Sequence, residues 1–361
     1  MSEIKQYKCP QCNGGIEFSA GAQRMKCPYC DTEFDVAVLE NYAAQLDSQK
    51  EDSASWSDFG GSEWQEGEEG SLSVFTCEAC SGQLIADENT AATACPFCGN
   101  PTVIPSRLSG SLRPDYVIPF RLDKKAAKEA LKRHLQGKRL LPRSFREENR
   151  IEEIRGIYVP FWLYNADTDA DILYRAESED RWEDDDYVYT KTEYYSVRRA
   201  GNMAFDRVPV DGSAKIDNTL MESIEPYDFS DAVDFNTAYL SGFLADKYDV
   251  DSQMCAPRAE ERIRQSTADA FRSTVTGYDS VRTVSSAIVL ENASAKYALY
   301  PVWLLNTNWE GKRYTFAMNG QTGKMVGDLP LDRWAYWRWF LGICAAVTAG
   351  SFALWTLISL L

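Results

Sequence analysis

Two cysteine cassettes constrain this sequence more than any other feature, because they share one spacing. The predicted metal ligands are Cys9, Cys12, Cys27 and Cys30 in the first cassette, and Cys77, Cys80, Cys95 and Cys98 in the second. In each cassette two C-x2-C pairs are separated by 14 residues, and the cassettes are offset by 68 residues. This pattern is typical of zinc ribbons, in which two tight turns hold one tetrahedral ion. The sequence therefore predicts two structural Zn²⁺ sites.

Two other metal chemistries fit the cysteine pattern less well than structural zinc. A rubredoxin-type iron site also uses two C-x2-C pairs, but typically with a longer gap between them. A catalytic zinc needs an open coordination position, which four thiolates do not leave. Each cassette is also too small to bury a core, so a structural metal would supply much of its folding energy. We therefore interpret residues 1–40 and 74–110 as zinc ribbons.

The charge of the chain argues against a nucleic-acid binder. Its 361 residues carry 38 Lys and Arg against 54 Asp and Glu, a formal net charge of −16. Over residues 1–110 the count is 6 against 17, so both cassettes lie in an acidic segment. A nucleic-acid interface needs a basic face to displace phosphate counterions. No apolar signal segment precedes Cys9, and paired cysteines without one suggest metal ligands in a reducing cytosol.

The C-terminal segment predicts a membrane anchor. Residues 339–361 form a run of 23 uncharged residues, about 34 Å long as a helix and long enough to cross a bilayer. Trp334, Trp337 and Trp339 crowd its N-terminal edge like an interfacial aromatic belt. Arg333 and Arg338 flank the same edge and place the body in the cytoplasm. The expectation is a single-pass cell-membrane protein anchored by residues 331–361; the alternative is a buried C-terminal helix.

The segment between the cassettes, residues 41–73, predicts an acidic disordered linker. It is rich in Ser, Gly and acidic residues, a composition that cannot bury enough apolar surface to fold. Trp56, Phe59 and Trp64 interrupt the acidic run. They are either isolated aromatic residues in a solvated linker or a short docking motif.

Residues 111–330 have the composition of an α+β domain. Asp123 precedes an amphipathic segment and predicts a capped helix that carries His134, the single histidine, beside its apolar stripe. Residues 157–164 and 299–305 predict buried strands with similar Pro-x-Trp-Leu sequences. The body therefore contains either two related halves or a chance similarity between aromatic strands. The predicted fold class is α+β: two zinc ribbons, this body and one C-terminal transmembrane helix.

No motif in the sequence predicts an enzyme. No Gly-Lys pair has the spacing of a phosphate-binding loop, and no nucleophile motif accompanies His134. Asp167, Asp169 and Asp171 resemble the start of a calcium loop, but Ile172 occupies the glycine position. The acidic segment 177–186 is either a solvated loop or a weak cation site.

Several segments resemble one bacterial family. The paired cassettes, YLSGFLADKYDVD at 239–251, YALYPVWLLN at 297–306 and YTFAMNGQTGKMVGDLP at 314–330 are similar to TFIIB-type zinc-ribbon-containing proteins. Some relatives are labelled primosomal helicases or phage replication proteins, and others are YdjG-like membrane proteins. The latter occur with PspA, SPFH-domain and TPM-domain proteins, which implies a role in envelope stress.

These observations together predict a non-enzymatic adaptor. It would be membrane-anchored, hold two structural Zn²⁺ ions and recruit protein partners to the cytoplasmic face of the membrane. The resemblance implies PspA, SPFH-domain or TPM-domain proteins as those partners. The alternative is a nucleic-acid-binding accessory factor related to replication or transcription zinc ribbons, against which the acidic charge argues.

Overall fold

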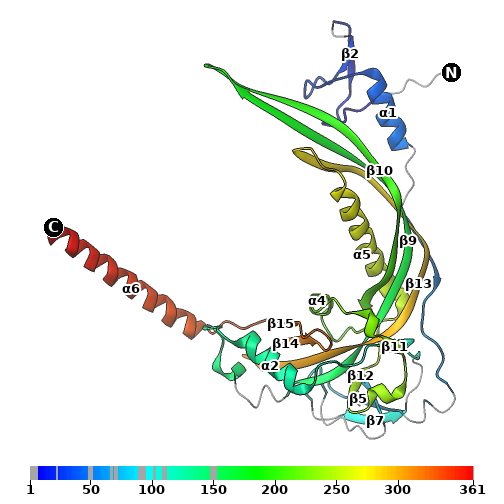
Figure 1. The fold of residues 1–361 in the computed structure, drawn as a ribbon, viewed down its shortest axis with the longest axis vertical. Coiled ribbons are helices and arrows are strands. Elements are labelled where there is room, and N and C mark those ends of the chain that lie inside the picture. Colours follow the sequence, from blue (N-terminus) through cyan, green and yellow to red (C-terminus); the bar gives the residue numbers. More distant parts are fainter. Residues whose placement is uncertain are drawn as a thin grey trace. The chain divides into compact units, whose positions relative to one another are not determined.

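Three very long strands dominate the fold (Figure 1). They are β9 (Arg155–Glu183), β10 (Val188–Asp211) and β13 (Ser280–Trp309), with 29, 24 and 30 residues. The computed structural model describes residues 7–21, 23–47, 52–65, 68, 72–87, 95–100, 103–107, 112–146 and 153–360. The strands predicted at 157–164 and 299–305 are confirmed as parts of β9 and β13.

The other strands are shorter. They are β1 (Glu17–Ser19), β2 (Arg24–Lys26), β3 (Glu33–Phe34), β4 (Ser53–Asp58), β5 (Leu72–Cys77), β6 (Gln83–Asp87), β7 (Val103–Arg107), β8 (Tyr116–Val117), β11 (Val233–Asp234), β12 (Leu244–Asp246), β14 (Lys312–Asn319) and β15 (Met325–Gly327). The helices are α1 (Val36–Asp47), α2 (Lys124–Leu135), α4 (Asn218–Ser223), α5 (Ser252–Ser273) and α6 (Arg333–Leu360). Short 3-10 turns are η2 (Arg143–Arg146), η3 (Phe229–Asp231) and η4 (Thr237–Leu240).

Most of these strands join one mixed sheet. Among the described residues it has twelve strands, with a main path in the order β11-β8-β13-β9-β12-β6-β5-β7. Strand β12 runs parallel to β9 and antiparallel to β6, so it joins the β5–β7 hairpins to the long strands. Strands β1 to β3 form a separate three-stranded sheet. The second cassette is therefore continuous with the main sheet, whereas the first has a small sheet of its own.

The chain divides into two compact units, each built from separate segments. Unit 1 contains residues 1–57, 165–206 and 260–293, and unit 2 contains residues 58–164, 207–259 and 294–361. The first cassette lies in unit 1 and the second lies in unit 2. The units are therefore not two consecutive halves of the body.

The core of unit 2 follows from the alternation of side chains along β13. Val302 and Leu304 pack into one apolar cluster with the second cassette, whereas Trp303 and Leu305 pack into another cluster with α2. Successive side chains of a strand point to opposite faces, so a strand covered on both faces is apolar at every position. This explains the uninterrupted apolar sequence that predicted this strand.

Helix α2 forms as its sequence predicts. Asp123 Oδ1 accepts a hydrogen bond from the Ala126 N–H at 2.8 Å, which caps the helix. Leu131 and Leu135 are buried in the cluster that includes Trp303. The His134 ring lies edge-on to Phe316, with ring centroids 6.2 Å apart, so this histidine packs against the core.

The predicted fold class is wrong. The structure is rich in strands and contains one large mixed sheet, where the sequence predicted an α+β body with a membrane anchor. The sequence pattern marks only short strands at 157–164 and 299–305 and leaves open whether they belong to two related halves. They are instead segments of β9 and β13, which lie side by side in the same sheet.

The predicted transmembrane anchor is also wrong, and with it the cell-membrane location. Residues 333–360 do form one helix, α6. None of the helices in the described part of the chain combines the length and the apolar character that crossing a bilayer requires. The prediction rested on the length of the run, its absence of charge and its flanking aromatic residues, but the run also contains residues such as Gly342, Thr348 and Gly350, which contribute little apolar surface.

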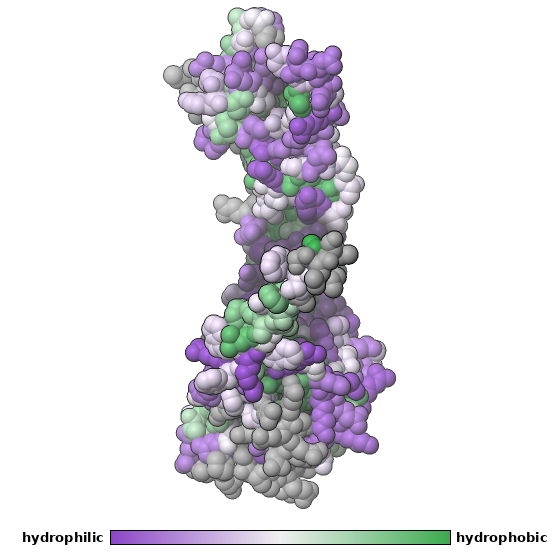
Figure 2. All heavy atoms as spheres, turned by 90° about the vertical axis from the view of Figure 1, so that its left-hand side faces the viewer, coloured by the Kyte–Doolittle hydropathy of each residue, from purple (hydrophilic) through white to green (hydrophobic). Residues whose placement is uncertain are grey.

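Helix α6 nevertheless exposes many apolar side chains. Figure 2 shows hydrophobic residues gathered over this helix. They include Trp334, Leu341, Ile343, Val347 and Phe352. Near its N-terminal end, the guanidinium of Arg139 lies 4.7 Å from the centre of the Trp339 ring.

Part of the segment expected to be disordered is a strand. Residues 53–58 form β4, which pairs with β13. Trp56 Nε1 donates to Glu260 Oε1 at 2.8 Å, and Trp64 lies edge-on to Phe235. Trp56 and Trp64 therefore each have a partner within their own unit.

Candidate metal centres

All four C-x2-C pairs adopt the same turn. In each, the N–H four residues after the first cysteine donates to that cysteine's carbonyl, and the cysteine's own N–H donates to the carbonyl five residues on. The residue after the second cysteine has a positive φ in every turn, and these residues are Asn13, Asp31, Ser81 and Gly99. Asn, Asp and Gly tolerate this conformation better than other residues. The sequence therefore forms four equivalent turns. Each turn points its two thiols toward the other turn of the same cassette.

The turns bring the thiols into two groups of four. The Sγ atoms of each cassette lie within 4.8 Å of one another, and each group could hold a metal ion. The Cys9–Cys30 and Cys12–Cys27 Sγ distances are 3.6 and 3.5 Å, and the Cys77–Cys98 and Cys80–Cys95 distances are 3.5 and 3.6 Å. A disulfide would need about 2.05 Å. Tetrahedral thiolates about 2.3 Å from a zinc ion stand roughly 3.8 Å apart, so both groups fit such an ion.

Hydrogen bonds favour the thiolate form at one position in each group. The Thr32 hydroxyl and backbone lower the pKa of Cys30 to about 6. At Cys77 burial acts to raise the pKa, but backbone hydrogen bonds from the Cys80 and Ala79 N–H groups lower it to about 7. A metal ligand must be deprotonated, so these bonds prepare the groups for a cation.

Arg175 holds the first cassette from strand β9. Its Nη1 donates to the carbonyls of Pro10 and Gln11, at 3.2 and 2.9 Å, within the first cysteine turn. Its Nη2 pairs with Glu177 at 3.0 Å. Leu39 of α1 is also fully buried in this unit. Ribbon 1, meaning residues 7–34 of the first cassette, is thus held within unit 1 by one cation and a helix.

Ribbon 2, meaning the described residues between 72 and 107, belongs to the core of unit 2. Cys77 and Cys95 are buried in the same apolar cluster as Ile157 and Leu163 of β9. Asn306 Nδ2 also donates to the Pro96 carbonyl at 2.6 Å. The second metal group is therefore part of the main core.

A buried ion pair stands beside ribbon 2. Lys215 Nζ lies 3.0 Å from Asp246 Oδ1 and 2.9 Å from Asp249 Oδ2, and Ser213 donates to Asp246 Oδ2 at 2.5 Å. Asp246 is completely buried, and burial raises its pKa to about 6. Lys215 also covers the Phe97 ring at 5.5 Å. The YLSGFLADKYDVD segment thus contributes a charge network that fixes β12 next to ribbon 2.

Asp211 gives a testable pH dependence. Its side chain is buried, and burial raises its pKa to about 7. Because the folded pKa exceeds the unfolded value, the native state is stabilised at low pH and loses that stability as pH rises through about 7. A single such group lowers the free energy of unfolding by about 1.4 kcal/mol between pH 6 and pH 8. Denaturant unfolding at both pH values should show this loss, and Asp211→Asn should reduce it.

The matched control is Asp234→Asn, at an exposed position of unit 2. It should keep the pH dependence of the unaltered protein. If the free energy of unfolding changed equally between pH 6 and pH 8 in Asp211→Asn and in the unaltered protein, the role assigned to Asp211 would be contradicted.

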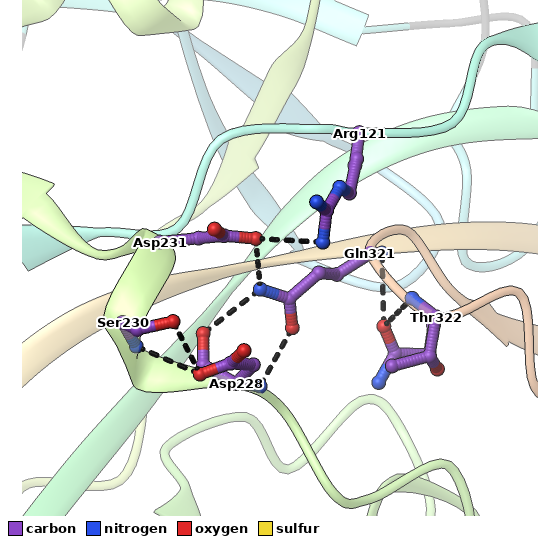
Figure 3. Close-up of polar contacts among 7 residues, drawn as sticks. Arg121, Asp228, Ser230, Asp231, Gln321 and Thr322 are labelled. Atoms are coloured by element: carbon purple, nitrogen blue, oxygen red, sulfur yellow. Dashed lines mark hydrogen bonds and ion pairs between the residues drawn. The ribbon is translucent and has the colours of Figure 1, made fainter.

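The YTFAMNGQTGKMVGDLP segment forms a polar clamp at the turn between β14 and β15 (Figure 3). The Gln321 side chain accepts from the Asp228 N–H at 2.7 Å and donates to the Asp228 carbonyl at 2.8 Å and to Asp231 at 2.6 Å. Asn319 accepts from the Gln321 and Thr322 N–H groups, each at 2.9 Å. Arg121 pairs with Asp231 on the exposed side. These contacts hold segment 224–231 in place. They also explain why the 314–330 motif contains Asn319 and Gln321.

The aspartates that resembled a calcium loop lie on strand β9. Asp171 pairs with Arg198 of β10, and Asp167 accepts from Asn292 at 2.9 Å. Among the described residues, the two cysteine groups are the clusters that could hold a metal ion. Sequence reasoning missed Arg175, Lys215, Asp211 and Asp246, because no short motif marks a charge that is buried only in the folded chain.

Comparison with known proteins gives one full-length similarity. The chain is 34% identical over 360 residues to a Bacillus subtilis (strain 168) protein named "Uncharacterized protein YdjG", covering 99% of this chain and 98% of the relative. No family model matches the chain, and no solved structure matches it. The similarity supports the resemblance to YdjG-like proteins that the sequence motifs indicated.

Proposed function

We propose that this chain, which belongs to the YdjG family, is a non-enzymatic adaptor that binds a protein partner through an exposed hairpin and is braced by two zinc ribbons. The observation that carries the proposal is a group of exposed aromatic side chains where β9 turns into β10. The metal groups support a bracing role, because four cysteines satisfy a tetrahedral ion and leave no position for a substrate.

Zinc is the metal we propose for both groups, as structural ribbons of the TFIIB type. Two C-x2-C turns with converging thiols match the closed tetrathiolate sites in which zinc stabilises small folds. In ribbon 2 the metal would fasten the β5–β7 hairpins to the main sheet. In ribbon 1 it would fasten the turn that Arg175 holds.

The hairpin tip comprises Trp182, Tyr187, Val188 and Tyr189. These side chains are 51%, 67%, 52% and 40% exposed, and the Trp182 and Tyr189 rings stack with centroids 5.6 Å apart. Large aromatic residues contribute most of the binding energy at many protein interfaces. Stacking also fixes the two rings before a partner arrives, which lowers the entropy lost on binding. The hairpin tip therefore presents a preformed aromatic surface.

The charge around the hairpin tip indicates the chemistry of the partner. Residues 177–187 contain seven carboxylates and one arginine, a formal net charge of −6. The carboxylate of Asp184 accepts from the Asp186 and Tyr187 N–H groups at 3.0 and 2.8 Å, which fixes the turn. An acidic surface with exposed rings suits a partner that presents Arg and Lys, through ion pairs and cation–π contacts. We therefore infer a protein with a basic surface as the ligand.

Direct binding of purified candidates tests this function. The family resemblance suggests PspA, SPFH-domain and TPM-domain proteins as the candidates. We expect one of them to bind the full chain with a micromolar Kd that weakens as salt increases. Replacing Trp182 and Tyr189 together with serine should weaken binding at least tenfold, because both rings leave the contact surface. Isothermal titration calorimetry at two salt concentrations provides the measurement.

Trp334→Ser is the matched control, because Trp334 is also an exposed tryptophan but lies in unit 2. It should leave the affinity unchanged. The proposal is overturned when none of the three candidates binds, or when the hairpin variant binds as tightly as the unaltered protein. Retention on DNA with a steep salt dependence would favour the nucleic-acid alternative instead.

A further inference from the structure

Helix α6 exposes an apolar surface along most of its length. Every residue from 336 to 352 is exposed, which is more than four turns and therefore includes every face of the helix. Ten large apolar side chains between Tyr336 and Ile358 are 42–66% exposed, and six of them are aromatic. A helix that is apolar on all faces is normally buried. This surface is therefore a candidate for association.

The beginning of α6 is fixed to unit 2, which holds the exposed surface in place. Asp332 Oδ1 caps the helix by accepting from the Ala335 N–H at 3.0 Å. The Asp332 N–H donates to the Leu140 carbonyl at 2.9 Å, and Arg139 covers the Trp339 ring. Because the helix is formed and attached before a partner arrives, association loses less conformational entropy.

The exposed area is large enough for a stable interface. An aromatic side chain buries about 150–250 Å², so ten large side chains that are about half exposed present on the order of 1,000 Å². The largest apolar patch on a typical monomer is about 300–600 Å². A standard interface takes about 800 Å² from each partner. Helix α6 alone supplies this area.

One row of these side chains has the spacing of a contact between helices. Tyr336, Phe340, Ile343 and Val347 follow one another at steps of four, three and four residues. A mean spacing near 3.5 residues keeps one row of a helix against a neighbouring helix, as in coiled coils. The Tyr336 and Phe340 rings stack with centroids 6.3 Å apart. Gly350 takes the next position, where the lack of a side chain allows close approach.

Charge indicates another copy of this chain as the partner. The whole chain has a formal net charge of −16, so two copies repel each other over most of their surface. Residues 339–361 carry no charged side chain, so two copies can meet there without like-charge contacts. A symmetric association places the same surface on both partners, and an uncharged apolar row is complementary to itself.

We propose that α6 is a self-association helix. Copies of this chain pack their α6 helices side by side along the row from Tyr336 to Val347, and further copies join over the remaining apolar faces. The surface uses residues other than the hairpin tip, so it stands independently of the proposed protein partner. Such a bundle would join several hairpin tips in one assembly and raise their avidity for a multivalent partner.

Size-exclusion chromatography with multi-angle light scattering on the full metal-loaded chain tests the proposal. One chain has a mass of 40.7 kDa, and we expect a defined assembly with a multiple of this mass at micromolar concentration. Ile343→Glu and Val347→Glu each place a charge in the row and should reduce the mass to that of one chain. Both side chains are more than half exposed, so neither change disturbs the packing of the folded chain.

Val38→Glu is the matched control, because Val38 is also an exposed valine on a helix but lies on α1 in unit 1. It should keep the mass of the unaltered assembly. Flotation with phosphatidylcholine vesicles tests lipid as the alternative cover of α6. The proposal is overturned when the unaltered chain is a monomer, when both α6 variants keep the assembled mass, or when vesicles convert the assembly into single, vesicle-bound chains.

Discussion

We expect replacement of Cys77 and Cys80 with serine to unfold unit 2, and the same change at Cys9 and Cys12 to leave unit 2 folded. With zinc in both cysteine groups, as proposed, each double substitution should reduce the bound zinc from two ions to one per chain. The effects differ because Cys77 lies in the apolar cluster that contains the central strands, whereas the first cassette belongs to unit 1. Structural zinc binding contributes about 10–16 kcal/mol in zinc-finger peptides, which is as large as the whole stability of a typical domain, about 5–15 kcal/mol.

Elemental analysis and hydrogen exchange together measure this outcome. Zinc content reports whether the cysteines are ligands, and exchange along β9 and β13 reports whether the core of unit 2 is intact. Unchanged zinc content in either variant would refute the ligand assignment. Full exchange protection in the Cys77/Cys80 variant would show that ribbon 2 is dispensable for the core.

The second large effect is expected at Asn319, which is completely buried in the polar clamp. Its amide donates to the Ile224 and Pro226 carbonyls at 3.0 and 3.1 Å and accepts from two N–H groups. Asn319→Leu leaves these four backbone groups without partners and should lower the free energy of unfolding by about 3–5 kcal/mol. Denaturant unfolding measures the loss.

Lys324→Ala is the control for this prediction. Lys324 donates to the Glu225 carbonyl from the same turn, but its side chain is exposed. An exposed hydrogen bond contributes little, so this variant should lose less than about 1 kcal/mol. If Asn319→Leu lowered the free energy of unfolding by a similarly small amount, water would be satisfying the four backbone groups in place of the Asn319 amide.

The sequence predicted the features that depend on neighbouring residues. The cysteine turns follow from local spacing, and Asp123 caps α2 because the Ala126 N–H lies three residues away. The strand at 157–164 was predictable because each of its faces is covered by apolar neighbours.

The length of β9 could not be predicted in the same way. After Tyr164 the acidic residues alternate with small ones, and this pattern resembled a metal-binding loop. In the structure Ala166, Thr168 and Ala170 are buried while the aspartates between them point away, which is the two-residue period of a strand. The correct interpretation depends on β10 lying alongside, where Arg198 pairs with Asp171.

The buried charges could not be predicted from the sequence for a similar reason. Lys215 and Asp246 are separated by 31 residues, and only the pairing of β12 with β6 and β9 brings one beside the other. A lysine and an aspartate in a chain with 25% charged residues are unremarkable until both are buried.

The interleaving of the two units restricts how this protein can be subdivided. The polypeptide passes between them five times, at residues 57/58, 164/165, 206/207, 259/260 and 293/294. Any single truncation therefore removes segments from both units or leaves one incomplete. Neither unit can be cloned as one contiguous fragment, and one contiguous exchange of sequence cannot replace a whole unit without also replacing part of the other. The similarity to YdjG extends over 99% of the chain and therefore spans the segments of both units.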